Sequence, residues 1–261
     1  MNKFIKRDGQ TATKIFDNRS VASDYRTLLP ILKKGLRVLD VGCGTGTIAK
    51  GIAEIVGETG FVVGIDNTEA FIQSGKESYG HISQLELIHA DLFQYQPTEK
   101  FDLIVSSRTL QWLSNPKDAI KKIKTLLKPG GQLSVLDYNH TALEWNPSPP
   151  QSMLNFYACF LKWRSDAGMN NAIAEDLPTY FEEAGFQSVT VFDSSETYTK
   201  GQGDFESKVG IWSKVAGSTQ MVEEGYISDE NRLKAIEEYN LWVNTEALKM
   251  TMELKEIRGI N

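Results

Sequence analysis

The segment VLDVGCGTGTIA, residues 38–49, most constrains how this chain can fold, because three glycines stand between an apolar run and a helical pattern. Gly42, Gly44 and Gly46 allow a sharp backbone turn and let a ligand approach without a Cβ in the way. The helix that follows has free N–H groups at its start. The order of strand, glycine loop and helix therefore predicts a ligand site at the end of a buried strand.

The same order of strand and helix recurs along the chain. Short apolar runs are typical of buried strands, and the segments between them have apolar residues at helical spacing. Strands that alternate with helices predict an α/β fold with a doubly wound, mostly parallel sheet and right-handed crossovers. The predicted strands are residues 36–41, 61–66, 85–91, 101–108, 132–139 and 188–193. The predicted helices are residues 47–56, a segment ending near Ser78, and residues 116–127, 177–186, 205–217 and 229–246.

Residues 248–255 show the clearest alternation in the chain. Apolar residues alternate with polar ones at Leu248, Met250, Met252 and Leu254. A period of two with polar partners is typical of a half-exposed strand, and such strands are usually antiparallel.

Charge and composition limit the partners of this chain. It has 28 basic and 34 acidic residues, a net charge of −6, whereas nucleic-acid binding rests on Lys and Arg. No apolar stretch approaches the roughly 18 residues of a membrane span, and the start, MNKFIKRDGQ, lacks the apolar run of a signal peptide. Cys43 and Cys159 have no metal-ligand spacing. We therefore expect no nucleic acid, no membrane, no metal site and a cytoplasmic location.

Two residues indicate which ligand the glycine loop suits. A dinucleotide-binding loop has a further glycine at the position of Thr47. Asp40 stands two residues before the loop, where its carboxylate would repel a pyrophosphate. S-adenosylmethionine has no phosphate and carries an ammonium and a sulfonium group, so a nearby carboxylate is favourable. The sequence therefore favours S-adenosylmethionine as the cofactor.

Polar residues at the ends of the next three strands suit the other parts of this cofactor. Asp66 can accept both ribose hydroxyls, and Asp91 can accept the adenine amine, with Ala90 and Leu92 beside the ring. Serines at the end of the fourth strand would approach the methionine part. The predicted cofactor-binding residues are Asp40, Gly42, Cys43, Gly44, Gly46, Asp66, Asn67, Ala90, Asp91, Leu92, Ser106 and Ser107, with Arg19 and Tyr25 from the N-terminal segment.

Either acid taken alone has a simpler interpretation. Asp40 could only cap N–H groups of the loop, and Asp66 could only cap its helix. Their occurrence together, in order with the glycine loop, favours a cofactor site.

The segments VLDVGCGTGTIA, VVGIDNT, HADLF, FDLIVSSRTLQWL and LLKPGGQLSVLDY, within about residues 36–138, resemble the class I S-adenosylmethionine-dependent methyltransferases. Residues 108–116, RTLQWLSNP, resemble the group acting on small molecules, which includes ubiquinone/menaquinone biosynthesis enzymes and trans-aconitate methyltransferases. The resemblance implies a seven-stranded sheet whose final strand inserts antiparallel between the strands at 132–139 and 188–193.

The resemblance also implies how the chain is organised. We expect a single methyltransferase domain over residues 1–261. Residues 1–35 would form an N-terminal helical lid, and residues 36–138 the cofactor-binding core. An irregular substrate-side insert would occupy residues 139–172, and residues 173–261 would complete the sheet.

His140 is the candidate catalytic residue. Methyl transfer is an in-line displacement at an activated carbon, so positioning and desolvation can supply much of the catalysis. A base is needed only if the nucleophile must lose a proton. His140 follows the fifth strand and could be that base, or it could be a loop histidine with an ordinary hydrogen bond.

Aromatic residues on the substrate side suit an apolar pocket. Arg164 could bind a substrate carboxylate. Trp112 could wall the methyl-donor site or pack between sheet and helix. Tyr25 and Arg19 could fold over the cofactor or form a solvated helix face. The predicted substrate residues are Arg108, Trp112, Trp145, Tyr157, Trp163 and Arg164.

The sequence thus predicts an enzyme, monomeric or homodimeric, that methylates an O, N or C atom of a small molecule. One alternative is a methyltransferase acting on RNA or protein, although the segment SSRTLQW lacks the Asn/Asp-Pro-Pro-aromatic motif that DNA amino-methylating enzymes usually share. A second is a catalytically silent cofactor-binding protein. A third is a nicotinamide dehydrogenase, against which Thr47 and Asp40 argue.

Overall fold

The computed structural model describes residues 19–261, which form two compact units. The sheet unit consists of residues 19–137, 173–194 and 255–261, and the helical unit of residues 138–172 and 195–254. The predicted division at residues 35, 138 and 172 does not coincide with these two units. The reason is that strands β5 (Leu127–Asn146) and β8 (Lys249–Ile260) each contribute residues to both units.

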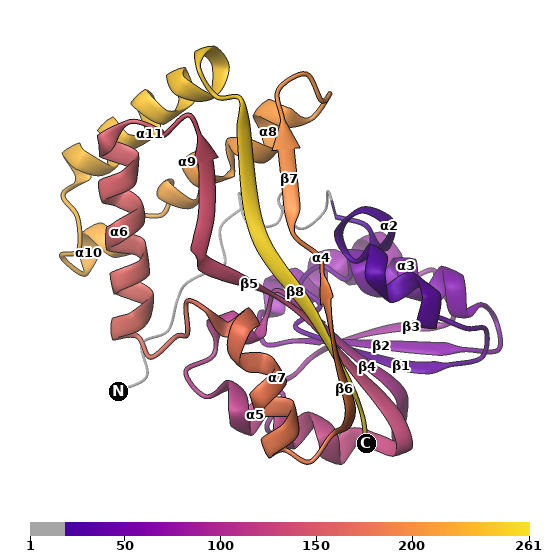
Figure 1. Cartoon of the computed structure of the whole chain (residues 1–261). Helices are drawn as coiled ribbons and strands as arrows, with labels where there is room; N and C mark the ends of the chain where they lie inside the picture. The colour runs from indigo at the N-terminus through magenta and orange to yellow at the C-terminus, as the bar shows by residue number, and fades with distance from the viewer. Residues whose placement is uncertain (1–18) are drawn as a thin grey trace. The chain divides into compact units, whose positions relative to one another are not determined.

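The described strands form an eight-stranded sheet (Figure 1). Seven of them are hydrogen-bonded in the order β3-β2-β1-β4-β5-β8-β6, and β7 pairs with β8 outside this order. The pairs from β3 through β5 are parallel, and β8 is antiparallel to β6 and β7. This confirms the predicted doubly wound, mostly parallel sheet and the place of its antiparallel strand; β7 adds an eighth strand. The strands are β1 Arg37–Val41, β2 Phe61–Asp66, β3 Leu85–His89, β4 Phe101–Ser107, β5 Leu127–Asn146, β6 Gln187–Asp193, β7 Glu196–Thr199 and β8 Lys249–Ile260.

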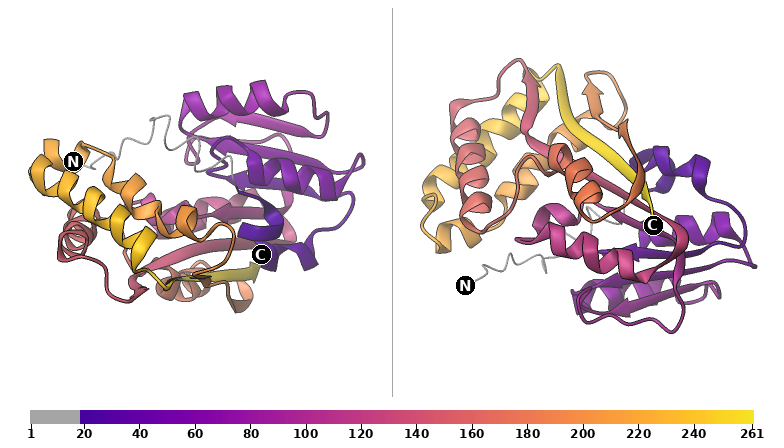
Figure 2. Two further views of the ribbon diagram at one scale, coloured as in Figure 1. Left: turned by 90° about the horizontal axis from the view of Figure 1, so that it is seen from above. Right: turned by 60° about the horizontal axis from the view of Figure 1, so that its bottom comes forward.

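Helices cover both faces of the sheet unit (Figures 1 and 2). The face under α5 and α7 buries one apolar cluster that includes Ile120, Ile123 and Phe181. On α3, the buried residues recur at helical spacing: Ile48, Ala49, Ile52, Ala53 and Val56. The helices of this unit are α2 Val21–Asp24, η1 Arg26–Ile31, α3 Thr47–Val56, α4 Glu69–Tyr79, η2 Leu110–Trp112, α5 Pro116–Leu126 and α7 Ile173–Glu183.

The parallel register brings the ends of the central strands to one edge. Asp40 is paired with Gly64 of β2 and Val105 of β4, and Asp66 is paired with His89 of β3. The strand order reverses between β1 and β4, which is where open α/β sheets bind their ligands.

Strand β8 continues beyond the alternating segment predicted from the sequence, to Ile260. Its second part lies between β5 and β6, with Glu256, Ile257 and Arg258 all buried. Because successive residues are enclosed on both faces, the period of two is lost there. The sequence pattern therefore stopped short of the true strand end.

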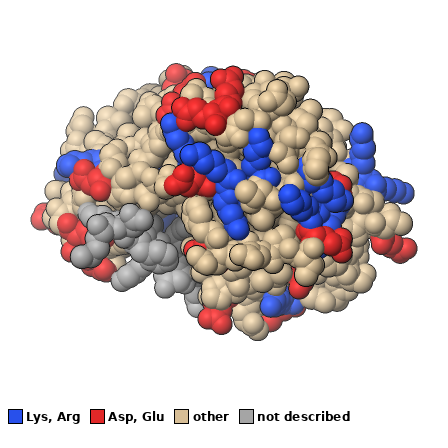
Figure 3. Space-filling view, turned by 90° about the horizontal axis from the view of Figure 1, so that it is seen from below, with Lys and Arg blue, Asp and Glu red and all other residues tan. Residues whose placement is uncertain are grey.

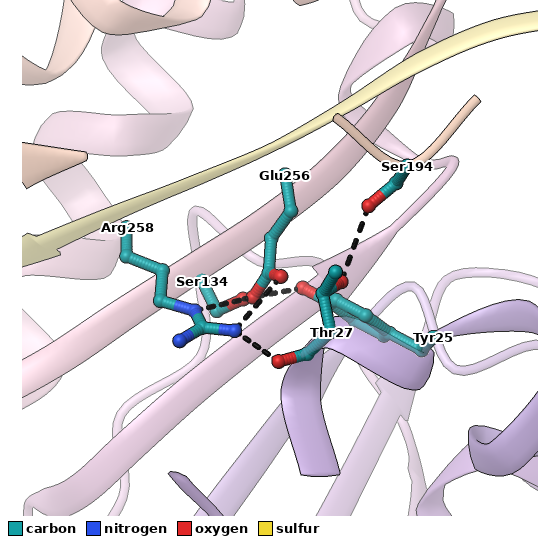
Figure 4. Close-up of polar contacts among 6 residues, drawn as sticks. All are labelled: Tyr25, Thr27, Ser134, Ser194, Glu256 and Arg258. Atoms are coloured by element: carbon teal, nitrogen blue, oxygen red, sulfur yellow. Dashed lines mark hydrogen bonds and ion pairs between the residues drawn. The ribbon is translucent and has the colours of Figure 1, made fainter. Parts of the chain in front are cut away.

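A buried polar network joins β8 to the N-terminal segment (Figure 4). The Ser134 hydroxyl donates to Oε1 of Glu256 at 2.5 Å, so Ser134 must accept from the Tyr25 hydroxyl, which lies 2.7 Å away. The Arg258 guanidinium donates to both oxygens of Glu256, at 2.7 and 2.9 Å. Burial, followed by the Glu256 charge, raises the pKa of Tyr25, so its phenol keeps the proton that it donates.

The same network fixes the described part of the predicted lid. Arg258 donates to the Thr27 carbonyl oxygen, and the Thr27 hydroxyl lies 3.2 Å from that of Ser194. Arg108 donates to the Asp24 carbonyl oxygen at 3.1 Å. The segment from α2 through η1 is thus anchored by two arginines; the lid prediction for residues 1–18 lies outside the described residues.

The helical unit corrects the prediction of an irregular insert at 139–172. Strand β5 continues to Asn146, prolines 147, 149 and 150 end it, and helix α6 begins at Gln151. Proline has no N–H for a sheet ladder but is tolerated at the start of a helix, which explains this sharp change. The helices of this unit are α6 Gln151–Asp166, α8 Phe205–Val209, α9 Ile211–Ala216, α10 Gln220–Glu223 and α11 Asp229–Thr245.

In the part of the chain that the structure describes, no helix combines the length and the apolar character needed to cross a membrane.

Replacing Glu256 by Gln should destabilise the protein by about 3 kcal/mol, because it leaves the buried Arg258 charge without its counter-charge. Urea unfolding would measure the loss. Glu54→Gln is the matched control, since Glu54 pairs with Lys50 on the exposed surface of α3 and should cost less than about 0.5 kcal/mol. Equal losses in the two variants would contradict the stabilising role of the network.

Candidate active site

The glycine loop is held against the end of β2. Gly42, Gly44 and Gly46 have φ angles of 74°, 57° and 85°, a region that L side chains rarely adopt. The N–H groups of Gly42 and Cys43 both donate to the Ile65 carbonyl oxygen, at 2.8 and 3.0 Å. The loop therefore has a fixed shape before any ligand binds.

Thr109 also holds the loop in place, a role that was not predicted from the sequence. Its hydroxyl donates to the carbonyl oxygens of Ser107, at 3.1 Å, and of Gly42, at 3.3 Å. A Cβ on Gly42 would lie 2.3 Å from the Thr109 side chain. The only hint in the sequence was its place just after the fourth predicted strand.

Asp66 ties the loop to the next helix. Its Oδ2 accepts the Gly44 N–H at 3.0 Å, and its Oδ1 accepts the Thr68 N–H at 2.9 Å. Thr68 is the residue before α4, so this contact is not a bond to a helical N–H of the kind that the capping interpretation requires. Each carboxylate oxygen can accept a further hydrogen bond, so the ribose role remains a prediction.

Asp40 has a buried carboxylate oxygen without a hydrogen-bond partner in the part of the chain that the structure describes. It is 2% exposed, and its Oδ2 has no hydrogen-bond partner among the described residues. Burial, and then the charge of Asp66, raises the pKa of this carboxyl to about 7. A buried carboxylate oxygen without a partner costs free energy that a cationic ligand would recover, so the residues fit the ammonium group of the expected cofactor.

The residues predicted around adenine lie at the end of β3. Asp91 is exposed, and its Oδ1 accepts the N–H groups of Phe93 and Gln94 at 2.7 and 3.3 Å. Ala90 and Leu92 are half-buried against the apolar cluster. Asn67, at the end of β2, uses its carbonyl oxygen to contact the His89 ring at 3.2 Å.

The residues at the end of β4 mainly hold the fold. Ser106 is fully buried and donates to the Val41 carbonyl oxygen at 3.0 Å, which ties β4 to β1. Arg108 is 5% exposed and donates to Ser107 Oγ and to Asp24, which directs its side chain to the N-terminal segment. Trp112 is half-buried in η2.

Comparison with known proteins identifies the family. A sequence model described as a methyltransferase domain matches residues 32–185, more than half of the chain. The chain belongs to this methyltransferase family. Membership confirms the predicted enzyme class and S-adenosylmethionine as its cofactor.

Individual relatives agree with this assignment. Demethylmenaquinone methyltransferase of Staphylococcus aureus is 29% identical over 180 residues, covering 61% of this chain and 71% of that protein. A solved S-adenosylmethionine-dependent methyltransferase from Aquifex aeolicus has a TM-score of 0.55 at 18% identity and covers 95% of this chain and 96% of its own.

Phosphoethanolamine N-methyltransferase 2 of Haemonchus contortus, solved with S-adenosyl-L-methionine, has a TM-score of 0.56 at 15% identity. The match covers the whole of this chain and 54% of that protein, so the chain spans about half its length. At these identities the two solved structures show the shared fold.

The predicted substrate residues of the methyltransferase lie in the helical unit, apart from Arg108 and Trp112. Trp145 and Tyr157 are in edge-to-face contact, with ring centroids 5.2 Å apart, and both contact Trp212. Trp145 donates to the Tyr239 hydroxyl at 2.9 Å, and Tyr157 donates to the His140 carbonyl oxygen at 2.6 Å. Trp212 lies within the predicted helix 205–217, but nothing in the sequence placed it in this cluster.

Trp163 and Arg164 belong to the interior of the same unit. Trp163 donates to Glu224 at 3.0 Å, while Arg164 is fully buried, donates to Asn171 at 2.8 Å and lies over the Phe160 ring. These contacts make both residues part of the unit's core, and the binding of a substrate carboxylate by Arg164 stays a prediction.

His140 is enclosed by the rings of Tyr138, Phe160 and Trp212. Burial, and then the charge of Arg164, holds the pKa of its imidazole well below 6.5. A group that resists protonation this strongly is a poor general base, because a base must hold the proton that it takes. The surroundings therefore favour a packing role.

No group of His, Cys, Asp and Glu side chains suited to a metal ion occurs among residues 19–261.

Gly42→Ala should weaken the binding of S-adenosylhomocysteine at least about tenfold, because the added Cβ displaces Thr109 and with it the loop. Gly130→Ala is the matched control: its φ of 75° imposes the same strain of about 1–2 kcal/mol, with no atom within 4 Å of the new Cβ. Calorimetric binding would compare them. Unchanged affinity in Gly42→Ala would contradict this account of the loop.

His140 should make stability fall on the acid side of pH 6.5. The unfolded imidazole takes up a proton there, whereas the folded one does not, so acid favours unfolding. Between pH 7.5 and 5.5 the wild type should lose about 1.4 kcal/mol more than His140→Gln. Urea unfolding at both pH values measures this, and equal losses in the two proteins would refute it.

Proposed function

We propose that this methyltransferase transfers the methyl group of S-adenosylmethionine to an O, N or C atom of a small-molecule acceptor, and that it does so as a monomer or homodimer in the cytoplasm. The observation that carries the cofactor part is the buried Asp40 oxygen without a partner, next to a preformed glycine loop. The acceptor part rests on similarity to demethylmenaquinone methyltransferase, whose name indicates a small quinone substrate.

Three parts of the sheet unit would each bind a different part of the cofactor. Asp40 would accept its ammonium group, the fixed loop would follow its methionine part, and Asp66 would accept its ribose hydroxyls with the free lone pairs of its carboxylate. When bound, S-adenosylmethionine supplies a methyl group already activated by the sulfonium.

Catalysis then needs little proton chemistry from the chain. With His140 held neutral and enclosed by rings, we propose that the enzyme acts by orienting the acceptor and excluding water rather than by general-base catalysis. An acceptor that is already nucleophilic, or that ionises easily, suits such a site.

The surface charge supports a small acceptor over RNA. Basic side chains gather on the face seen from below, but acidic side chains lie among them (Figure 3). Lys117 pairs with Glu183 at 2.8 Å, and Lys128 pairs with Asp102 at 2.7 Å. Such local neutralisation, in a chain of net charge −6, leaves little excess positive charge for a phosphate backbone.

Methyl transfer from labelled S-adenosylmethionine into a fractionated cell extract tests the proposal. We expect label in the small-molecule fraction, beginning with demethylated quinones as the first class to examine. Gly130→Ala should retain transfer and Gly42→Ala should lose it. Label in RNA or protein would favour those acceptors instead, and cofactor binding without transfer to any fraction would favour the catalytically silent alternative.

A further inference from the structure

Asp40 is set at the end of β1 with a carboxylate oxygen that the described chain does not satisfy. An ionised carboxylate that is 2% exposed, with an oxygen that has no hydrogen-bond partner among residues 19–261, is costly, and this cost falls on the charged form alone. The neutral acid avoids the cost. The geometry by itself therefore favours a proton on Asp40 whenever no cation is nearby.

Among residues 19–261, the charged side chain that acts on Asp40 is Asp66, and its charge is negative. Asp66, on β2, accepts a backbone N–H with each of its oxygens, an arrangement suited to a carboxylate that opposes a second negative charge beside it. The other titratable neighbours are the Cys43 thiol and the Tyr25 phenol. Burial raises the pKa of both, so both are neutral near pH 7 and neither compensates a charge on Asp40.

We propose that Asp40 holds a proton in the cofactor-free protein and releases it to solvent when the ammonium group of the cofactor binds. This rests on the cofactor site described above. It adds that binding is a proton-exchange reaction, so that the affinity of the enzyme for its cofactor depends on pH.

The exchange balances without any other reactant. The O–H bond of the Asp40 carboxyl breaks and its proton passes to water or buffer. The resulting carboxylate accepts a hydrogen bond from the ammonium group, which keeps its three protons. No covalent bond of the cofactor changes, and the incoming cation offsets the new negative charge beside Asp66.

The direction of the pH effect follows from the two ionising groups. Burial and Asp66 raise the pKa of Asp40 to about 7, so below that pH binding must displace a proton and affinity falls as pH falls. The ammonium group of the ligand loses its own proton only at higher, alkaline pH, so affinity should fall again there. Affinity should therefore be greatest at a pH above 7 and below the pKa of that ammonium group.

Calorimetric titration with S-adenosylhomocysteine in buffers of different ionisation enthalpy measures the released protons directly. This product carries the same ammonium group and is used as the probe. At pH 6.5 we expect about 0.75 proton released per molecule bound. The dissociation constant should rise about fivefold from pH 7 to pH 6.

Three variants separate Asp40 from other titrating groups. Asp40→Asn should release no proton at pH 6.5 and should lose the acid side of the pH dependence. Asp66→Asn removes the charge that opposes ionisation of Asp40, so release should fall below the wild-type value. Asp204→Asn changes an exposed aspartate at the start of α8, in the helical unit, and should release protons like the wild type.

Each result has a definite meaning. Binding by the wild type without proton release at pH 6.5 overturns the proposal and leaves the proposed function intact. Full release by Asp40→Asn assigns the proton elsewhere and also overturns it. No binding of S-adenosylhomocysteine by the wild type would instead contradict the cofactor site itself. If Asp40→Asn does not fold, the wild-type buffer and pH series still decides.

Discussion

The carboxylate of Asp66 is the interaction on which the cofactor site depends. It accepts N–H groups from the glycine loop and from the residue before α4, so one side chain fixes the end of β2, the loop and the next helix relative to each other. By standing beside Asp40, it also makes that carboxyl hard to ionise. The same carboxylate of Asp66 therefore both holds the loop in place and raises the pKa of Asp40.

A second buried carboxylate, Glu256, has the opposite environment. Two donors of Arg258 and the Ser134 hydroxyl satisfy it, so it stabilises the place where β8, β5 and the N-terminal segment meet. In Glu256 the sheet unit thus has a buried acid whose two oxygens are paired, and in Asp40 one whose Oδ2 has no partner among the described residues. Of these two acids, Asp40 is the one with an oxygen that can still accept a hydrogen bond from a ligand.

The sequence predicted the sheet and the glycine loop well, because both follow from local patterns of apolar residues and glycines. It could not locate the end of β8, since Glu256 and Arg258 read as exposed residues until their pairing is known. It did not find Thr109, whose role depends on a contact with Gly42, 67 residues earlier. The regular structure within 139–172 was missed because aromatic residues and prolines hid the continuation of β5. Features that follow from a local sequence pattern were therefore predictable, whereas contacts between residues far apart in the sequence were not.

The long separations within the Glu256 network also bear on how the chain is made. Ser134 and Glu256 are 122 residues apart, and Thr27 and Arg258 are 231 apart. During synthesis the glycine loop and both aspartates of the site emerge long before residues 255–260, the part of β8 that follows the helical unit in sequence. Until β8 arrives, β5 has an open edge and Tyr25 and Ser134 lack their charged partner. Contacts this distant in sequence form slowly, and an open strand edge can pair with other chains in the meantime, so the growing chain is open to misassembly until residues 255–260 have been added.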